Sequence, residues 1–357
     1  MRVASGAKGR RVALVLALAV SVLVAPAMAR EPVAARATED PRPSGRIVVP
    51  RGQDIVAIDV GAGAEQVLFA ARPTELILDV GLGADGRQVV FSRLTLARRD
   101  DPGGADLYRL PVGSAEPVLV AAHAQPGDII SGPLPVPGGT SVVYTYAPYG
   151  LAASGLDPAP RIERVDLGGG APSLVVQEAE TPAPMPDGTG LVFVRRTARG
   201  DALWLVNLDG SGAREILPPD RFLSLAYPRV SPDGTRIAVA ATLEGSGLPI
   251  PLRPDVSGGA PRLGATRPAL RLRPRWQPAR PPAHGLPWDL WLVPVAGGEP
   301  QRLTYWYEDD PSLAWSPDGR WLAVQGGSGL RVLDVDSGYT LWLRREPAFG
   351  AIDWGRN

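Results

Sequence analysis

The sequence predicts an all-β fold, a six-bladed β-propeller, from three observations. A turn motif recurs along the chain, hydrophobic residues alternate on both sides of each turn, and glycine and proline are abundant. Of 357 residues, 42 are glycine and 39 are proline. This content favours many short strands joined by tight turns over helices. Hydrophobic residues make up 45% of the chain, which is ample for a buried core.

The first 29 residues are expected to be a signal peptide. A basic segment precedes the apolar run 12–25, and Ala27-Met28-Ala29 offers a cleavage site of the small-x-small type. An uncleaved membrane anchor is the alternative. Residues 30–45 then form a short linker to a propeller over 46–357. We expect export to the periplasm or the extracellular space, with no transmembrane helix after cleavage.

Charge and cysteine content exclude several classes of function. Cleavage after Ala29 leaves 33 basic against 37 acidic residues, and this balance does not suit nucleic-acid binding. The chain contains no cysteine, which excludes disulfides, cysteine-ligated zinc and thiol chemistry. We expect a monomer without a cofactor.

The turn motif is clearest in residues 227–239 and 313–324. Both read strand, Ser-Pro-Asp-Gly, strand. Proline fixes φ, aspartate bonds to its own backbone and glycine accepts positive φ, so the motif predicts a hairpin. Looser copies of the motif precede further apolar runs at 83–86, 136–139 and 185–188.

A second hairpin follows each of these turns. Residues 106–110, 161–165, 202–206 and 289–293 alternate in hydrophobicity and lead into a glycine-rich turn and a fourth strand. The spacing between successive first turns is about 46 to 53 residues. Four strands per unit at this period are typical of propeller blades.

The units predict six four-stranded antiparallel blades. Segment 46–69 supplies strands two to four of one blade, and 349–354 supplies its first strand. Pairing of the C-terminal strand with the N-terminal strands would close the ring and remove its free sheet edges. The other five units cover 74–122, 128–177, 181–217, 225–304 and 311–345.

These Ser-Pro-Asp-Gly units, with the strand 289–292 and the Leu-Thr ending at 303–304, resemble the TolB-like propeller repeat over residues 46–357. The resemblance implies a binding role toward a protein or a cell-envelope polymer. TolB itself carries an α/β domain before its propeller, and only a short segment precedes the first strand here. Functions tied to that domain are therefore not carried over.

Candidate binding residues fall in the loops between blades and between second and third strands, the loop-rich face of a propeller. Aromatic side chains beside carboxylates suit sugar or peptide recognition, although packing between blades is the alternative. The candidates are Tyr305, Trp306, Tyr307, Glu308, Asp309, Arg98, Arg99 and Tyr149.

An insertion at 244–287 has a different composition. It contains ten prolines and seven arginines against two acidic residues, and we expect it to be disordered. A solvated loop is one interpretation. The functional alternative is a basic arm in which Arg271, Arg273 and Arg275 contact anionic lipid headgroups, a polysaccharide or an acidic partner.

Motifs for catalysis and metal binding are weak. Residues 81–86 match G-x-G-x-x-G, but the following strand indicates a hairpin rather than a dinucleotide site. The two histidines, His123 and His284, are too few for a histidine-rich metal site, and no G-x-S-x-G motif occurs. We therefore expect no metal site and no catalytic residue.

The alternative is a propeller hydrolase or lyase acting on glycans or small esters. It would use channel carboxylates such as Glu178, Glu180, Glu308, Asp309 or Asp310. Three or more carboxylates clustered in the channel would favour this enzyme, whereas apolar residues and arginines there would favour binding.

Overall fold

Strands and turns make up the part of the chain that the computed structural model describes. This part forms 24 strands and no helix, which confirms the all-β class, and contains no helix able to cross a membrane. It lies within one compact unit, Arg42–Asn357. Residues 1–29 and 244–286, the predicted signal peptide and most of the predicted insertion, lie outside it. The described residues are 42–83, 85–100, 102–148, 159–242 and 287–356.

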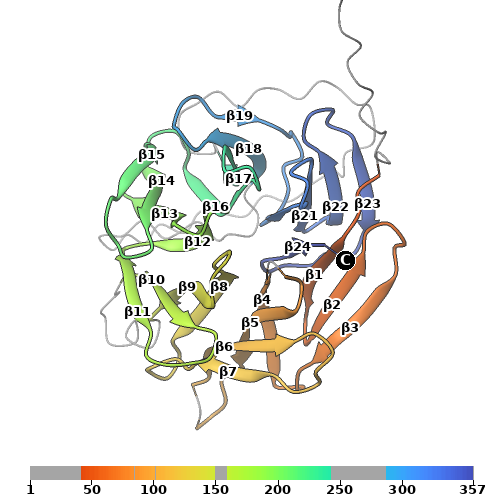
Figure 1. Ribbon diagram of the computed structural model, residues 1–357, viewed down its shortest axis with the longest axis vertical. Helices are drawn as coiled ribbons and strands as arrows, with labels where there is room; N and C mark the ends of the chain where they lie inside the picture. The colour runs from red at the N-terminus through yellow and green to blue at the C-terminus, as the bar shows by residue number, and fades with distance from the viewer. Residues whose placement is uncertain (1–41, 84, 101, 149–158, 243–286, 357) are drawn as a thin grey trace, which may run out of the picture. The chain divides into compact units, whose positions relative to one another are not determined.

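The strands stand in groups around a common centre, the arrangement of a β-propeller (Figure 1). Neighbouring strands within each group are antiparallel. One four-stranded sheet combines both ends of the described chain, in the order β24 (Asp353–Gly355), β1 (Arg46–Arg51), β2 (Asp54–Asp59) and β3 (Glu65–Ala70). Within it, Ile47 of β1 pairs with Trp354 of β24.

An eight-stranded sheet contains two such groups. A single parallel bridge between Ala105 and Ile129 joins them. The first group is β4 (Glu75–Leu82), β5 (Gln88–Thr95), β6 (Gly104–Pro111) and β7 (Val118–Ala121). The second is β8 (Ile129–Pro135), β9 (Ser141–Ala147), β10 (Arg161–Asp166) and β11 (Ser173–Gln177).

Three further sheets have four strands each. The first contains β12 (Glu180–Pro184), β13 (Gly190–Thr197), β14 (Gly200–Asn207) and β15 (Arg214–Leu217). The second contains β16 (Ser224–Val230), β17 (Arg236–Thr242), β18 (Asp289–Pro294) and β19 (Gln301–Arg302). The third contains β20 (Ser312–Trp315), β21 (Trp321–Gly326), β22 (Gly329–Asp334) and β23 (Thr340–Arg344).

These groups begin and end within two residues of the five units predicted from the sequence. The C-terminal strand is shorter than predicted, since it starts at Asp353 rather than at Phe349. The reason is that the amide of Ala351 donates to Oδ1 of Asp79 at 2.7 Å, and its carbonyl accepts from Val80. The backbone of this segment therefore bonds to β4 instead of continuing the pairing with β1.

The Ser-Pro-Asp-Gly motif forms the predicted turn. In residues 231–234, Oδ1 of Asp233 accepts the amide of Thr235 at 3.0 Å, and Gly234 has φ of 72°. The Ser231 hydroxyl accepts the amide of Arg236 at 3.0 Å. Oδ1 of Asp318 accepts the amide of Arg320 in the same way. Because side chains satisfy the turn amides, the two inner strands are held in register.

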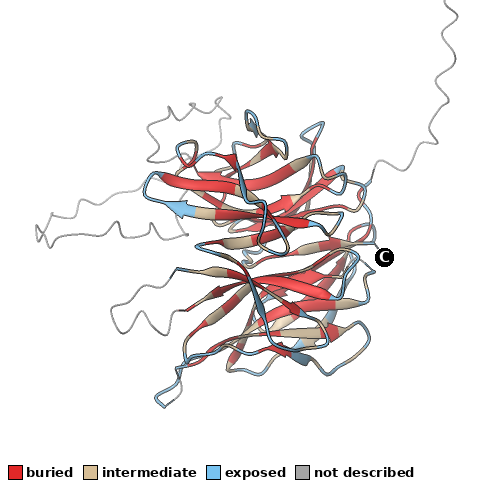
Figure 2. Ribbon diagram, turned by 60° about the vertical axis from the view of Figure 1, so that its left-hand side comes forward, coloured by how far each residue is buried: buried red, intermediate tan, exposed pale blue. Residues whose placement is uncertain are grey.

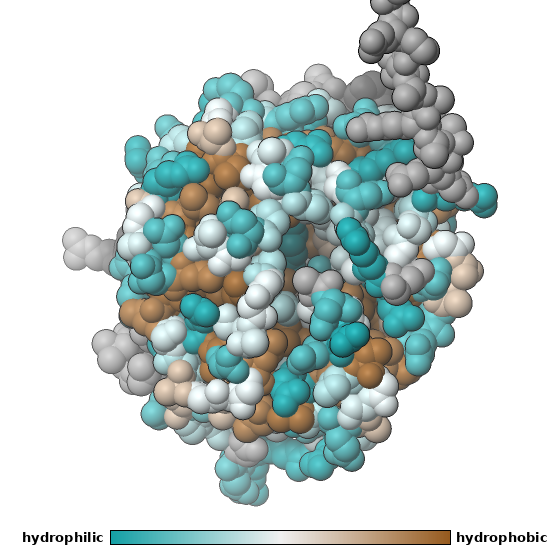
Figure 3. All heavy atoms as spheres, viewed as in Figure 1, coloured by the Kyte–Doolittle hydropathy of each residue, from teal (hydrophilic) through white to brown (hydrophobic). Residues whose placement is uncertain are grey.

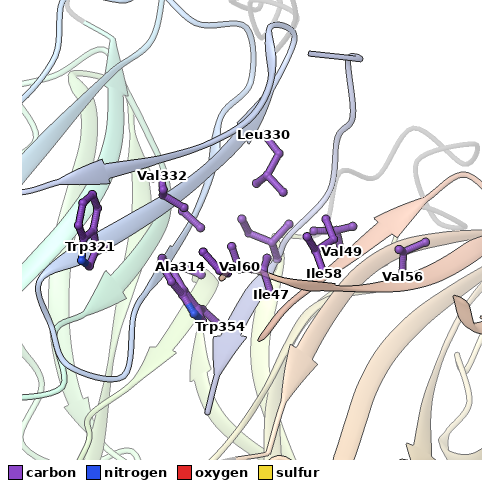
Figure 4. Close-up of a cluster of buried hydrophobic side chains, with 12 residues drawn as sticks. Ile47, Val49, Val56, Ile58, Val60, Ala314, Trp321, Leu330, Val332 and Trp354 are labelled. Atoms are coloured by element: carbon purple, nitrogen blue, oxygen red, sulfur yellow. The ribbon is translucent and has the colours of Figure 1, made fainter. Parts of the chain in front are cut away.

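Buried residues run along the middle of the strands, and exposed residues gather at the turns (Figure 2). Strands near both ends of the described chain contribute to one of these buried clusters. There Ile47, Val49 and Trp354 pack with Ala314 and Val332, so the sheet of β1 and β24 contacts the sheet of β20–β23 (Figure 4). Hydrophobic packing thus joins the first strands of the propeller to its last ones.

Candidate functional site

The innermost strands surround a cavity of about 250 Å³, called the central cavity below. Its walls come from β4, β8, β12 and β16, and from three residues outside all of the named strands, Trp288, Asp310 and Ala351. Figure 1 shows these strands nearest the centre of the ring. Thr145 and Arg196 also line it, toward the ends of β9 and β13. Strands of four groups therefore line one small volume, together with residues from the segments before β18, β20 and β24.

A repeated backbone irregularity shapes this cavity. In β8, β12 and β16, the pairing register shifts at a residue followed by proline: Gly132, Thr181 and Tyr227. Their φ angles are 57°, 52° and 48°, and Asp310, which precedes Pro311, has 45°. Proline cannot donate to the strand ladder. Left-handed residues other than glycine carry strain of about 1–3 kcal/mol and concentrate at functional sites. All four line the cavity.

Asp79 ties three parts of the ring together. The residue is 6% exposed. Its Oδ2 accepts the amide of Gly132 at 2.8 Å, and its Oδ1 accepts the amide of Ala351 at 2.7 Å. Both oxygens therefore bond to backbone, which fixes the position of this negative charge in the cavity wall.

Arg229 of β16 places a positive charge beside Asp79. Nη1 donates to the carbonyl of Pro228 at 3.1 Å, and Nη2 donates to that of Ile352 at 3.4 Å. Nε has no hydrogen-bond partner within the described residues. Burial lowers the pKa of Arg229, while the charges of Asp353 and Asp79 raise it. Burial raises the pKa of Asp353, and the charge of Arg229 lowers it.

Tyr227 lines the cavity together with two carboxylates, Asp79 and Asp310. Burial raises its pKa well above the usual value of 10.0, and the negative charges of Asp79 and Asp310 raise it further. The phenol is therefore neutral at physiological pH and can donate a hydrogen bond. Glu180 of β12 and Arg196 of β13 also line the cavity and form an ion pair. The cavity wall thus holds three acids, two guanidinium groups and a phenol.

A second hollow of about 500 Å³, called the side groove below, adjoins the cavity. Asp79 and Tyr227 line both hollows. The rest of the groove is mostly apolar, with Arg51 as its other charged residue. It is lined by the turn between β1 and β2, the start of β4 and residues 347–350. A ligand could therefore extend from the polar cavity into an apolar groove.

The segment 305–309 does not line the cavity, but it adjoins two residues that do, Trp288 and Asp310. Trp288 and Glu308 form an isolated bridge, and Asp310 follows directly. Tyr305 is 46% exposed, with the Arg302 guanidinium 4.1 Å from its ring centroid. Oδ1 of Asp289 accepts the backbone amides of Trp306 at 2.6 Å and Tyr307 at 3.3 Å.

Two of the predicted aromatic and acidic side chains make packing contacts instead. Glu308 is 4% exposed, forms an ion pair with Arg331 and accepts the amide of Ser328 at 2.8 Å. The same Arg331 lies 3.4 Å from the ring centroid of Trp306. Both side chains thus hold the segment against β22, and Asp309 is half-buried beside them.

The other predicted residues lie away from the cavity or outside the described chain. Arg98 and Arg99 are exposed between β5 and β6. The candidates outside the described residues are Tyr149, Arg271, Arg273 and Arg275. Of the carboxylates considered for catalysis, Glu180 and Asp310 line the cavity. The sequence analysis did not identify Asp79, Tyr227 and Arg229 as candidates. The residue-proline pairs before the repeated turns could have indicated the strands that line the cavity.

The residues of the motifs set aside in the sequence make local contacts within the described chain. In the hairpin between β4 and β5, the amide of Gly83 donates to the carbonyl of Gln88 at 2.8 Å, and the amide of Gly86 donates to the carbonyl of Gly83 at 2.8 Å. His123 Nδ1 lies 2.6 Å from Oδ1 of Asp106. Within the described ranges, no group of three or more histidine, aspartate or glutamate side chains could hold a metal ion. The face seen in Figure 3 mixes hydrophilic and hydrophobic residues.

Comparisons with known proteins identify the fold. No family model and no curated protein matches the chain. TolB from Acinetobacter baumannii is similar with a TM-score of 0.60 at 15% identity, covering 88% of this chain and 67% of that one. A structure described as TolB from Agrobacterium tumefaciens gives 0.55 at 15% identity, covering 88% and 98%. A chain of the nidogen/laminin complex gives 0.56 at 10% identity, covering 87% and 97%.

Proposed function

Starting from the TolB-like β-propeller fold that these similarities show, we propose that the protein is a non-enzymatic, exported binding protein. It recognises a protein or a cell-envelope polymer at the central cavity and the loops around it. The observation that supports this most is the cavity itself, because residues from β4, β8, β12 and β16 converge on about 250 Å³. Concave sites with a few convergent polar groups are the usual places for ligands.

The proposal includes six blades in a closed ring. The eight-stranded sheet counts as two blades because only one bridge joins its halves. β24 then completes the blade of β1–β3, and the pairing of Ile47 with Trp354 supports that closure. A closed ring has no free sheet edge between its first and last blades. Closure also stabilises the central cavity, because its walls cannot separate unless the pairing of β24 with β1 breaks.

The hydrogen bonding of the acids favours binding over carboxylate catalysis. A general acid or base must exchange a proton with its substrate. Both oxygens of Asp79 accept backbone amides, and Glu180 is paired with Arg196. These carboxylates are better placed to present fixed charge than to transfer protons.

The predicted loop residues form the outer part of the proposed site. Exposed Tyr305 and the neighbouring Tyr307 would contact a ligand that protrudes from the cavity. Arg98, Arg99 and Tyr149 would lie further out on the same face. The basic insertion around Arg273 would contribute a separate, electrostatic contact with an acidic partner.

Capture from a cell-envelope extract tests this proposal. Three proteins are compared: the wild type, Ala226→Trp, which fills the cavity from β16, and Ala62→Trp in the exposed turn between β2 and β3. We expect one partner to bind the wild type and Ala62→Trp but not Ala226→Trp. Equal capture by all three proteins would refute the cavity as the site. A fourth protein lacking residues 246–285 reports the contribution of the insertion.

A further inference from the structure

Several groups in the wall of the central cavity have hydrogen atoms left to donate. The hydroxyls of Tyr227 and Ser131 make no hydrogen bond within the described residues. The Thr145 hydroxyl accepts the amide of Thr181 at 2.9 Å, which leaves its own hydrogen for another acceptor. The Arg229 guanidinium has five N–H groups, and only two carbonyls within the described residues accept from it. The wall therefore offers donors to a ligand.

Asp79 supplies acceptors in the same wall. An ionised carboxylate has about four lone-pair sites. The amides of Gly132 and Ala351 use one site on each oxygen, so both oxygens can accept again. Donors and acceptors therefore lie together in one cavity, independently of its net charge.

Hydroxyl groups match this mixture better than charged groups do. An ammonium group only donates, and a carboxylate only accepts, so either one would leave part of the wall unmatched. A hydroxyl does both, and a ligand with several hydroxyls can bond to Tyr227, Ser131 and Asp79 at once. Connected hydrogen bonds of this kind strengthen one another where water is scarce. A sugar ring, with hydroxyls on neighbouring carbons, meets this requirement.

The sizes and surfaces of the two hollows indicate a chain of sugars. The central cavity of about 250 Å³ takes one sugar ring. The side groove of about 500 Å³ continues from Asp79 and Tyr227 and is mostly apolar. Phe349, which is 39% exposed, is among the residues that line it. Aromatic side chains offer a large apolar contact area, which suits the C–H faces of a second ring.

From this arrangement we propose that the central cavity takes one ring of an uncharged glycan and that the side groove takes the ring next to it. Tyr227 and Ser131 donate to hydroxyl oxygens of the first ring, and Asp79 accepts from its hydroxyls. Phe349 packs against the second ring. This proposal rests on the proposed binding function and selects a polysaccharide rather than a protein as the partner.

Calorimetric titration of the purified protein with oligosaccharides tests the proposal. The uncharged probes are maltotriose, mannotriose, galactotriose and tri-N-acetylchitotriose. Trigalacturonate and chitotriose are the charged counterparts of the last two. We expect at least one uncharged trisaccharide to bind, and to bind about tenfold or more tightly than the charged probes and than its own monosaccharide, because charge leaves wall groups unmatched and the shorter probe loses the groove contact.

Three results of this titration would overturn the proposal. If none of the uncharged trisaccharides binds, the site does not take an uncharged glycan. If a charged trisaccharide binds most tightly, the matching of hydroxyls to the wall is wrong. If the monosaccharide binds as tightly as the trisaccharide, the side groove does not hold a second ring.

Two variants and a matched control locate the effect. Tyr227→Phe and Ser131→Ala each remove one hydroxyl from the cavity wall, and each should weaken binding of the trisaccharide about fivefold. Tyr339→Phe removes a hydroxyl from the exposed turn 335–339 between β22 and β23 and should leave the affinity unchanged. Unchanged affinity in both cavity variants would refute the site.

The two proposals fail in different ways. If Ala226→Trp abolishes capture of the envelope partner but no uncharged trisaccharide binds the wild type, the binding function stands and the glycan inference is wrong. If Ala226→Trp leaves capture intact, the cavity is not the binding site and both proposals are wrong.

Discussion

Trp354 offers the sharpest test of how the ends of the chain are joined. Its side chain is 5% exposed and packs in the cluster of Ile47, Val49 and Ala314. The indole Nε1 donates to the carbonyl of Ser44 at 3.0 Å. Gly45 has φ of 102°, and a Cβ there would lie 2.8 Å from Nε1. Glycine at position 45 therefore leaves the space that the indole ring of Trp354 occupies.

The expected cost of Trp354→Ala follows from these contacts. Replacing a buried tryptophan with alanine removes its apolar burial and leaves a cavity, at about 3–5 kcal/mol. Trp354→Phe keeps most of the packing and loses the hydrogen bond to Ser44, so it should cost about 1–2 kcal/mol. The exposed strand residue Leu119 is the control, and Leu119→Ala should stay within about 0.5 kcal/mol.

Urea denaturation of the four proteins, followed by tryptophan fluorescence and by circular dichroism, measures these differences. The midpoint should fall in the order Leu119→Ala, Trp354→Phe, Trp354→Ala, with the slope unchanged. A cost below about 1 kcal/mol for Trp354→Ala would refute the reasoning, because it is what a frayed end would show. The pairing of β24 with β1 would then not hold the ring together.

Three further predictions concern buried groups. Glu308→Gln leaves the Arg331 charge buried without its partner and should lower the free energy of unfolding by about 3 kcal/mol or more. The double variant Glu308→Gln with Arg331→Met should recover part of this loss in the same denaturation assay. Burial and the hydrogen bond to an acid raise the pKa of Tyr146 to about 12, so its contribution to stability is complete below pH 10 and is lost as the pH rises toward 12. Urea denaturation between pH 9 and pH 12 measures this loss, and Tyr146→Phe should make it smaller without abolishing it, because the pKa of Tyr227 is raised as well. Gly350→Ala should lower the thermal midpoint by at least several degrees, because φ is 100° and a Cβ would lie 1.9 Å from the carbonyl of Leu78; an unchanged midpoint would contradict the backbone geometry.

The fold was largely predictable because its signals are local. The Ser-Pro-Asp-Gly turns at 231–234 and 316–319 and the alternating strands on both sides depend on neighbouring residues alone. The short C-terminal strand was less predictable. Its start depends on the Ala351 amide bonding to Asp79, two residues 272 positions apart in the sequence.

The site was predicted only in part, for a related reason. Tyr305 and Asp310 stood out because aromatic and acidic residues are adjacent there. Trp306 and Glu308 belong to the same aromatic and acidic run, but both side chains contact Arg331 and pack against β22. Asp79 and Tyr227 each sit on a different strand, and only the ring brings them together.

The most direct test of the account places a photoreactive group in the cavity. Tyr227 is replaced by benzoylphenylalanine in one protein and Asp336 in another, and both are irradiated with cell-envelope extract. We predict a covalent adduct with one partner from position 227 and none from position 336. An adduct from 336 alone, or equal adducts from both positions, would contradict the claim that this propeller binds its partner at the central cavity.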